Sequence, residues 1–131
     1  MNLVILSGRL ITEPTSRELP AGGAIWAFDL TTDVDASTVA AAALPAGRVS
    51  VPVVWSGDAI PPSWGQDTEL VVTGVVRRRF FRSGGATQSR TEVVASAVVE
   101  VTKRRPAARA IERALCSLGA DDRSALRSTT G

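Results

Sequence analysis

TELVVTGVVRRRFFR, at residues 68–82, runs into SGG at 83–85, and SRTEVVASAVVEVT returns at 89–102. Both arms are rich in valine and threonine, which favour β-strands, and the glycines between them are typical of a tight turn. The stretch therefore predicts a long β-hairpin. Gly74 interrupts the apolar run of the first arm, which indicates a β-bulge or a barrel corner at that point.

Three segments upstream of this hairpin also have the composition of strands, namely residues 2–11, 24–32 and 48–55. In the last of them Pro52 cannot donate a hydrogen bond to a neighbouring strand, so part of the segment is expected at a sheet edge or a bulge. Five strands joined by loops rich in glycine and proline are typical of a small barrel. The simplest such architecture is the five-stranded OB-fold, an all-β fold that is widely used to bind oligonucleotides.

Two regions do not read as strands. Residues 33–47 are expected to form a mobile excursion between strands, with a short helix capped by Asp35 as the alternative. After the hairpin the pattern becomes helical, because Ile111, Leu115 and Leu118 recur at helical spacing. Gly119 predicts the end of this short helix, and a frayed tail is expected beyond it.

The chain of 131 residues has the length of one domain. We expect an OB-fold domain at residues 1–102, followed at 103–131 by a basic linker, the short helix and the tail. The helix is expected to pack on its own barrel, with a subunit contact as the alternative, and Cys116 is expected to be a small buried residue on it.

Composition argues against several classes of function. The chain has no histidine, no tyrosine, a single cysteine and a single lysine, Lys103. It therefore lacks the commonest general base and the commonest metal ligand, and it can form no internal disulfide. We expect no cofactor, no metal and no enzymatic activity. No apolar run approaches the ~18 residues of a membrane span, and the N-terminus has no features of a secretory signal, so a cytoplasmic protein is expected.

The positive charge is concentrated in one part of the chain. Residues 1–76 carry three arginines against eight acids, whereas residues 77–113 carry ten arginines and lysines against three acids. Residues 114–131 are balanced, which leaves a formal net charge of +2. Such a concentration indicates a face for an anionic partner, although a charge run is by itself also compatible with a solvated surface.

The outgoing arm of the hairpin combines arginines with aromatic rings. On a strand, Arg77, Arg79 and Phe81 share one face, while the other face holds Arg78, Phe80 and Arg82. Proteins that bind single strands without reading their sequence use cations for the phosphates and aromatic rings on which the bases stack. The alternative is a solvated hairpin whose arginines only prevent edge-to-edge aggregation.

GRLITEPTSRELPAGGAIWAFDLTT, at residues 8–32, resembles the N-terminal signature of the bacterial single-stranded DNA-binding protein (SSB) family. The family has Gly-x-Leu at the end of the first strand, then Pro and Arg, then Pro-x-Gly-Gly-Ala and a strand with alternating Phe and Leu. The matching residues are Gly8, Leu10, Pro14, Arg17, Pro20, Gly22, Gly23, Ala24, Phe28 and Leu30. The resemblance implies an OB-fold that binds single-stranded DNA as a homo-oligomer, usually a tetramer and otherwise a dimer, in replication, recombination or repair. It also implies that the protein is associated with the nucleoid.

The resemblance also implies roles for individual residues. Phe81 and Trp55 stand at or beside positions where the family keeps stacking aromatics, Arg77 and Arg79 at basic positions, and Arg9 at a polar DNA-contacting position. The candidate nucleic-acid-binding residues are Trp55, Phe81, Arg77, Arg79, Arg82, Arg9, Arg90 and Trp64. Of the other aromatics, Trp26 is expected in the barrel core and Phe80 is expected to be packed. Trp64 could stack on a base, staple its loop or face another subunit.

The chain also departs from the family. Residues 33–50 contain none of the family's aromatics, and the acidic C-terminal tip is replaced by ALRSTTG. An alternative function is therefore an OB-fold replication accessory protein, similar to the primosome proteins derived from this family, whose main ligand is another replication protein.

Overall fold

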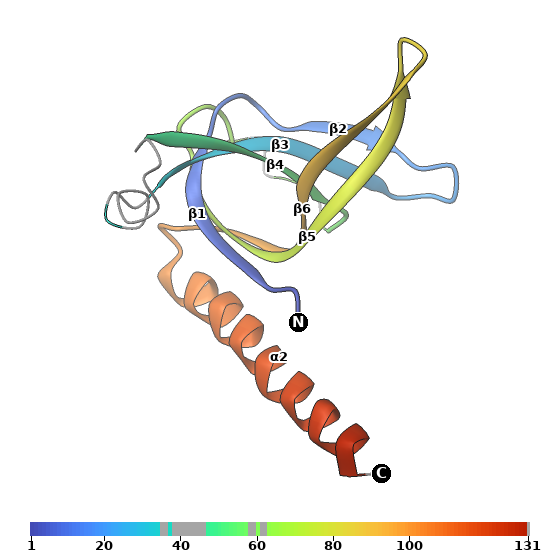
Figure 1. Cartoon of the computed structure of the whole chain (residues 1–131). Coiled ribbons are helices and arrows are strands. Elements are labelled where there is room, and N and C mark those ends of the chain that lie inside the picture. The colour runs from blue at the N-terminus through green and yellow to red at the C-terminus, as the bar shows by residue number, and fades with distance from the viewer. Residues whose placement is uncertain (35–36, 38–46, 58–59, 61–62, 131) are drawn as a thin grey trace.

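The computed structural model describes residues 1–34, 37, 47–57, 60 and 63–130 (Figure 1). Within them the chain forms an all-β body followed by one helix. The elements are β1 (Val4–Leu10), β2 (Thr15–Glu18), β3 (Ala24–Asp33), β4 (Arg48–Trp55), β5 (Glu69–Ser83), β6 (Ala86–Glu100) and α2 (Arg104–Thr130). The expected strands are confirmed, and β2 is a short addition in the segment between Pro14 and Pro20.

The strands close into a barrel. Their order is β1-β5-β6-β4-β3-β2, and β1 also pairs with β3, so five strands form a ring with β2 attached outside it along β3. Neighbours are antiparallel except for β4 and β6, which are parallel. The core is filled by apolar side chains that alternate with outward-facing ones, among them Leu10, Phe28, Leu30, Val53, Leu70 and Val72. This architecture is the predicted five-stranded OB-fold.

Gly8 allows the barrel to close. At this point β1 passes from its pairing with β5 to its pairing with β3, which starts at Arg9 opposite Thr31. A Cβ atom at position 8 would collide with the backbone carbonyl oxygen of Thr31. Only glycine therefore lets the two strands approach this closely.

The β5–β6 hairpin projects beyond the barrel (Figure 1). Gly84 and Gly85, with φ of 59° and 81°, form its two-residue turn, in which both residues need positive φ. This turn sets the register along the arm. The register shifts between Thr73 and Gly74, which confirms the β-bulge expected at Gly74.

Pro52 lies where β4 changes from an edge to an inner strand. Residues 48–52 of β4 pair only with β3, and the parallel pairing with β6 begins at Val53. A proline is tolerated here because no second strand needs its missing N–H group. The expectation of a partial edge at Pro52 is confirmed.

Helix α2 packs on the barrel with small residues. Ala107 and Ala110 are buried, whereas Leu115, Leu118 and Cys116 are exposed. The helix does pack on its own barrel, but the expectations that the leucines do this and that Cys116 is buried are wrong. The side of the helix that faces β5 and β6 carries small residues, since Ala114 and Ser117 line a hollow together with residues of these strands, and Leu115, Cys116 and Leu118 lie on other sides. Beyond this contact the helix runs away from the barrel (Figure 1).

The helix is also longer than expected, because it continues through the predicted end at Gly119 to Thr130. A glycine costs a helix only about 1 kcal/mol relative to alanine, and no proline follows it. No helix in the described part of the chain is both long and apolar enough to cross a bilayer.

The excursion predicted at residues 33–47, with its alternative helix capped by Asp35, lies mostly outside the described residues. Its two ends are held together, since the N–H group of Val34 donates a hydrogen bond to the carbonyl oxygen of Gly47 at 3.0 Å. The loop therefore returns to the barrel close to where it leaves.

Candidate nucleic-acid interface

An open groove of about 450 Å³ lies between the outer face of β3 and β4 and the base of the β5–β6 hairpin. One side is formed by β2 and the residues before it, the floor by β3 and β4, and the other side by the hairpin. The hairpin side chains that line it are Arg79, Arg90 and Glu92. This is the face on which OB-folds bind oligonucleotides.

The floor of the groove is formed by the outward-facing positions of two strands. Phe28 and Leu30 point into the core, so the alternate residues Ala27 and Asp29 face outward. The floor also includes Ile25, Pro52 and Val54, together with the buried side chains of Phe28 and Val53. The floor is thus largely apolar and contains no exposed aromatic ring.

The hairpin has two faces with different chemistry, since residues paired across antiparallel strands point to the same side. We call the side that contributes to the groove the groove face; it holds Arg77, Arg79, Phe81, Gln88, Arg90 and Glu92. The opposite side, the far face, holds Arg78, Phe80, Arg82, Thr87, Ser89 and Thr91. The division of the arginines and phenylalanines predicted from strand periodicity is confirmed.

Each arginine of the groove face has a carboxylate beside it. Nη2 of Arg77 lies 2.5 Å from Oε1 of Glu92, and Nε of Arg79 lies 3.7 Å from the same oxygen. The side chain of Glu92 is only 2% exposed, whereas the side chains of Arg77 and Arg79 are about half exposed. The carboxylate therefore positions two cations whose outer sides remain open to solvent.

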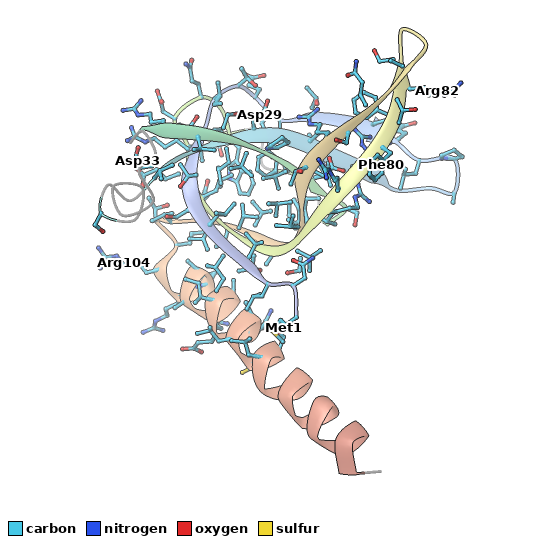
Figure 2. The ribbon with its side chains drawn as sticks, viewed as in Figure 1. Met1, Asp29, Asp33, Phe80, Arg82 and Arg104 are labelled. Atoms are coloured by element: carbon cyan, nitrogen blue, oxygen red, sulfur yellow. The ribbon has the colours of Figure 1, made fainter. Side chains whose placement is uncertain are left out.

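A second ion pair crosses the groove. Nη2 of Arg90 lies 3.6 Å from Oδ1 of Asp29, and both side chains are about half exposed. Asp29 appears in Figure 2 on the body of the barrel, to the left of the projecting hairpin. Exposed pairs of this kind contribute about 0–1 kcal/mol, so a phosphate can displace the carboxylate at little cost.

Both phenylalanines of the hairpin are exposed. Phe81 is 37% exposed, and the Cζ atom of Arg79 lies 5.6 Å from the centre of its ring. Phe80 is 66% exposed, with Cζ of Arg78 at 6.0 Å. The expectation that Phe80 is packed is wrong, because the arm extends past the barrel and no other element of the described chain covers its far face.

The tryptophans belong to the barrel. Trp26 and Trp55 lie directly opposite each other on β3 and β4, half-buried and packed against the core. The core position predicted for Trp26 is thus confirmed in part. Trp55 does not line the groove, and its stacking role stays a prediction.

Trp64 is only 6% exposed, and its Nε1 atom donates a hydrogen bond to Oε1 of Glu100 at 2.6 Å. A ring buried to this extent offers no face to a base, which favours the alternative that Trp64 staples its loop, and its role in nucleic-acid binding stays a prediction.

The remaining candidates lie in different places. Arg9 lines a separate hollow beside the start of α2, with its Nε atom 3.9 Å from Oε1 of Glu69. Arg82 is on the far face near the hairpin tip (Figure 2). The structure therefore brings Arg79 and Arg90 into the groove, with Arg77 and Phe81 beside them on the groove face, and it separates Trp55, Trp64, Arg9 and Arg82 from them.

Sequence reasoning missed Glu92 as part of the site. A signal for it exists: a two-residue turn at Gly84 and Gly85 places Glu92 directly opposite Arg77 by counting back along the arms. Among the described residues no group of three or more potential metal-ligand side chains occurs.

The strand order and the closed ring define an OB-fold. No protein-family model matches the chain, and no curated protein matches it in sequence. Among solved structures it is similar to the SSB of Plasmodium falciparum in complex with single-stranded DNA, with a TM-score of 0.63 and 20% identity over 76% of this chain and 94% of that chain. This likeness establishes the fold.

Proposed function

We propose that the protein binds single-stranded DNA with little sequence specificity, along the groove between β3, β4 and the hairpin. The observation that carries this proposal is the placement of Arg79 and Arg90 over an apolar floor, with the exposed ring of Phe81 on the same hairpin face. A similar fold occurs in an SSB bound to single-stranded DNA.

The groove and the adjoining groove face of the hairpin together supply the two kinds of contact that such binding needs. The side chains of Arg77, Arg79 and Arg90 are each about half exposed and can contact phosphates. Phe81 offers a ring face to one base, and the apolar floor accommodates sugars and bases without reading their edges. Every nucleotide sequence offers the same phosphates and a base ring that can stack, so these contacts are expected to depend little on the DNA sequence.

The carboxylates of Glu92 and Asp29 moderate this binding. In the free protein they hold the arginines in place over the groove, and a bound phosphate competes with them. The groove is thus organised before the strand arrives, at the cost of part of its positive potential. Nothing in this arrangement performs chemistry, so we propose a binding protein rather than an enzyme.

We further propose that the protein acts as a homo-oligomer, a tetramer or otherwise a dimer, in DNA replication, recombination or repair. Residues 4–8 of β1 pair with β5 on one side and, within the described residues, with no strand on the other. Residues 1–8 contain no charged side chain, and Ile5 among them is exposed. An uncharged open strand edge is suited to pairing with a second copy.

A titration of a labelled oligo(dT) by fluorescence anisotropy tests the proposal, with a duplex of the same length as the control. We expect tighter binding to the single strand than to the duplex, and an affinity that falls as salt is added. Absence of binding to oligo(dT) at low salt would contradict the proposal.

A second candidate function is that of a replication accessory protein whose main ligand is another protein. The mixed charge of the groove favours it, because Glu13, Asp29 and Glu92 lie among its arginines and no exposed ring lines it. Affinity capture from cell extract, with and without nuclease treatment, separates the two. Partners that are all lost after nuclease digestion would count against this candidate.

A further inference from the structure

The far face of the hairpin differs from the groove face in its charge. Its cross-strand pairs are Arg78 with Thr91, Phe80 with Ser89 and Arg82 with Thr87. It contains two arginines and no acid, and neither arginine has an ion-pair partner among the described residues, whereas every arginine of the groove face has one. The far face is therefore the less neutralised side of the arm.

Phe80 is the most exposed large apolar side chain in the described part of the chain, at 66%. The guanidinium of Arg78 lies 6.0 Å from its ring centre, which leaves most of the ring open to solvent. Figure 2 shows Phe80 and Arg82 on the projecting arm, with Arg82 near its tip. A ligand can thus reach the ring without any rearrangement of the protein.

The spacing of these groups suits an extended nucleic-acid strand. Arg78 and Arg82 stand two residues before and after Phe80, which places each of them ~6.6 Å from it along the strand. The facing residues Thr87, Ser89 and Thr91 all carry hydroxyl groups, which donate hydrogen bonds to phosphate oxygens. Cations, hydroxyls and one open ring therefore lie on the same face of the hairpin, and these are the groups that single-strand binding uses.

We propose that the far face, through Arg78, Phe80 and Arg82, is a second binding site for single-stranded nucleic acid. One nucleic-acid segment then lies in the groove and another on the far face of the hairpin. The two segments come from the same nucleic-acid strand or from two strands. This inference rests on the proposed function of the groove. It goes further because it assigns nucleic-acid binding to a separate surface, so that each protein chain binds a second nucleic-acid segment.

The test is the number of short oligonucleotides that one chain binds. An oligo(dT) of about eight nucleotides, within the ~4–16 that one OB-fold covers, is added to the full chain and the complexes are counted by native mass spectrometry. We expect two bound oligonucleotides per chain. Phe80→Leu keeps the apolar bulk without the ring and is expected to weaken the second site by roughly 5- to 150-fold, whereas Phe80→Trp retains it.

The matched control is Phe81→Ala, which is expected to weaken the first site and leave the second. One oligonucleotide per chain, with Phe80→Leu unchanged, would overturn the inference and leave the proposed function intact. Absence of binding at either site would contradict the proposed function itself. If Phe80→Leu alters the mass of the assembly in light scattering but not the binding of oligo(dT), the far face is a subunit contact and the inference is wrong.

Discussion

Glu92 lies directly opposite Arg77 across the β5–β6 hairpin, and its buried carboxylate accepts a hydrogen bond from that guanidinium at 2.5 Å. Arg79 approaches the same oxygen at 3.7 Å. A carboxylate that is 2% exposed needs such partners, because an unpaired buried charge is costly. Glu92 thus fixes two arginines on the groove face and cancels one of their two charges.

Replacing Glu92 with glutamine is expected to have opposite effects on folding and binding. The free energy of unfolding should fall by about 1–3 kcal/mol, because a charge-assisted hydrogen bond is lost. Affinity for oligo(dT) should rise, and the log–log salt slope should steepen by roughly 0.7 if one more arginine becomes free for a phosphate. Urea unfolding and a salt-dependent titration measure the two effects. A flatter slope would show that Glu92 is needed to orient the arginines.

Phe81 and Trp55 are expected to respond differently to truncation. Phe81→Ala should weaken binding to oligo(dT) by about 1–3 kcal/mol with little change in stability, because the ring is exposed on the hairpin. Trp55→Ala should mainly lower the free energy of unfolding, by roughly 2–3 kcal/mol, because its ring packs against the core. Titration and urea unfolding of both variants give the comparison. A large loss of affinity in a stable Trp55→Ala variant would restore the stacking role predicted for it.

Trp64 is expected to matter for stability alone. Trp64→Phe keeps most of the packing but removes the hydrogen bond to Glu100, which should cost about 1–2 kcal/mol. Thermal or urea unfolding should detect this loss, while binding to oligo(dT) should be unchanged at a temperature where the variant is folded. Weaker binding by the folded variant would mean that this buried ring takes part in DNA contact.

Gly8→Ala tests the closure of the barrel. The added methyl group would meet the Thr31 carbonyl oxygen, so the variant should lose roughly 1–3 kcal/mol of stability. Gly65→Ala is the matched control, since no atom lies within 4 Å of the added methyl group. Equal stability of the two variants would mean that β1 and β3 can separate at this point without cost.

The sequence predicted most of the barrel because its strands have strong β-propensity and clear turn signals. The boundaries expected at residues 48–55 coincide with β4, and Gly74 does mark the bulge. The alternation of arginine and phenylalanine correctly divided the hairpin into two faces, because side chains of a strand alternate regardless of the rest of the fold.

The parts that sequence did not predict depend on contacts between distant residues. Trp64 lies in a loop without periodicity, so only the barrel around it and Glu100 explain its burial. Phe80 was expected to pack because it points away from Phe81, but the barrel ends before it and leaves it exposed. The leucines of α2 have helical spacing, yet the side of the helix that faces the barrel carries alanines and a serine, which leaves Leu115 and Leu118 exposed.

The claim that single-stranded DNA binds in the groove is tested most directly by the salt dependence of oligo(dT) binding. The wild type is compared with an Arg79→Gln, Arg90→Gln double variant. The groove predicts a weaker variant whose log–log slope is flatter by roughly 1.4, since two phosphate contacts on a single strand are lost. Parallel slopes and equal affinities would contradict it, because the strand would then lie somewhere other than between β3, β4 and the hairpin.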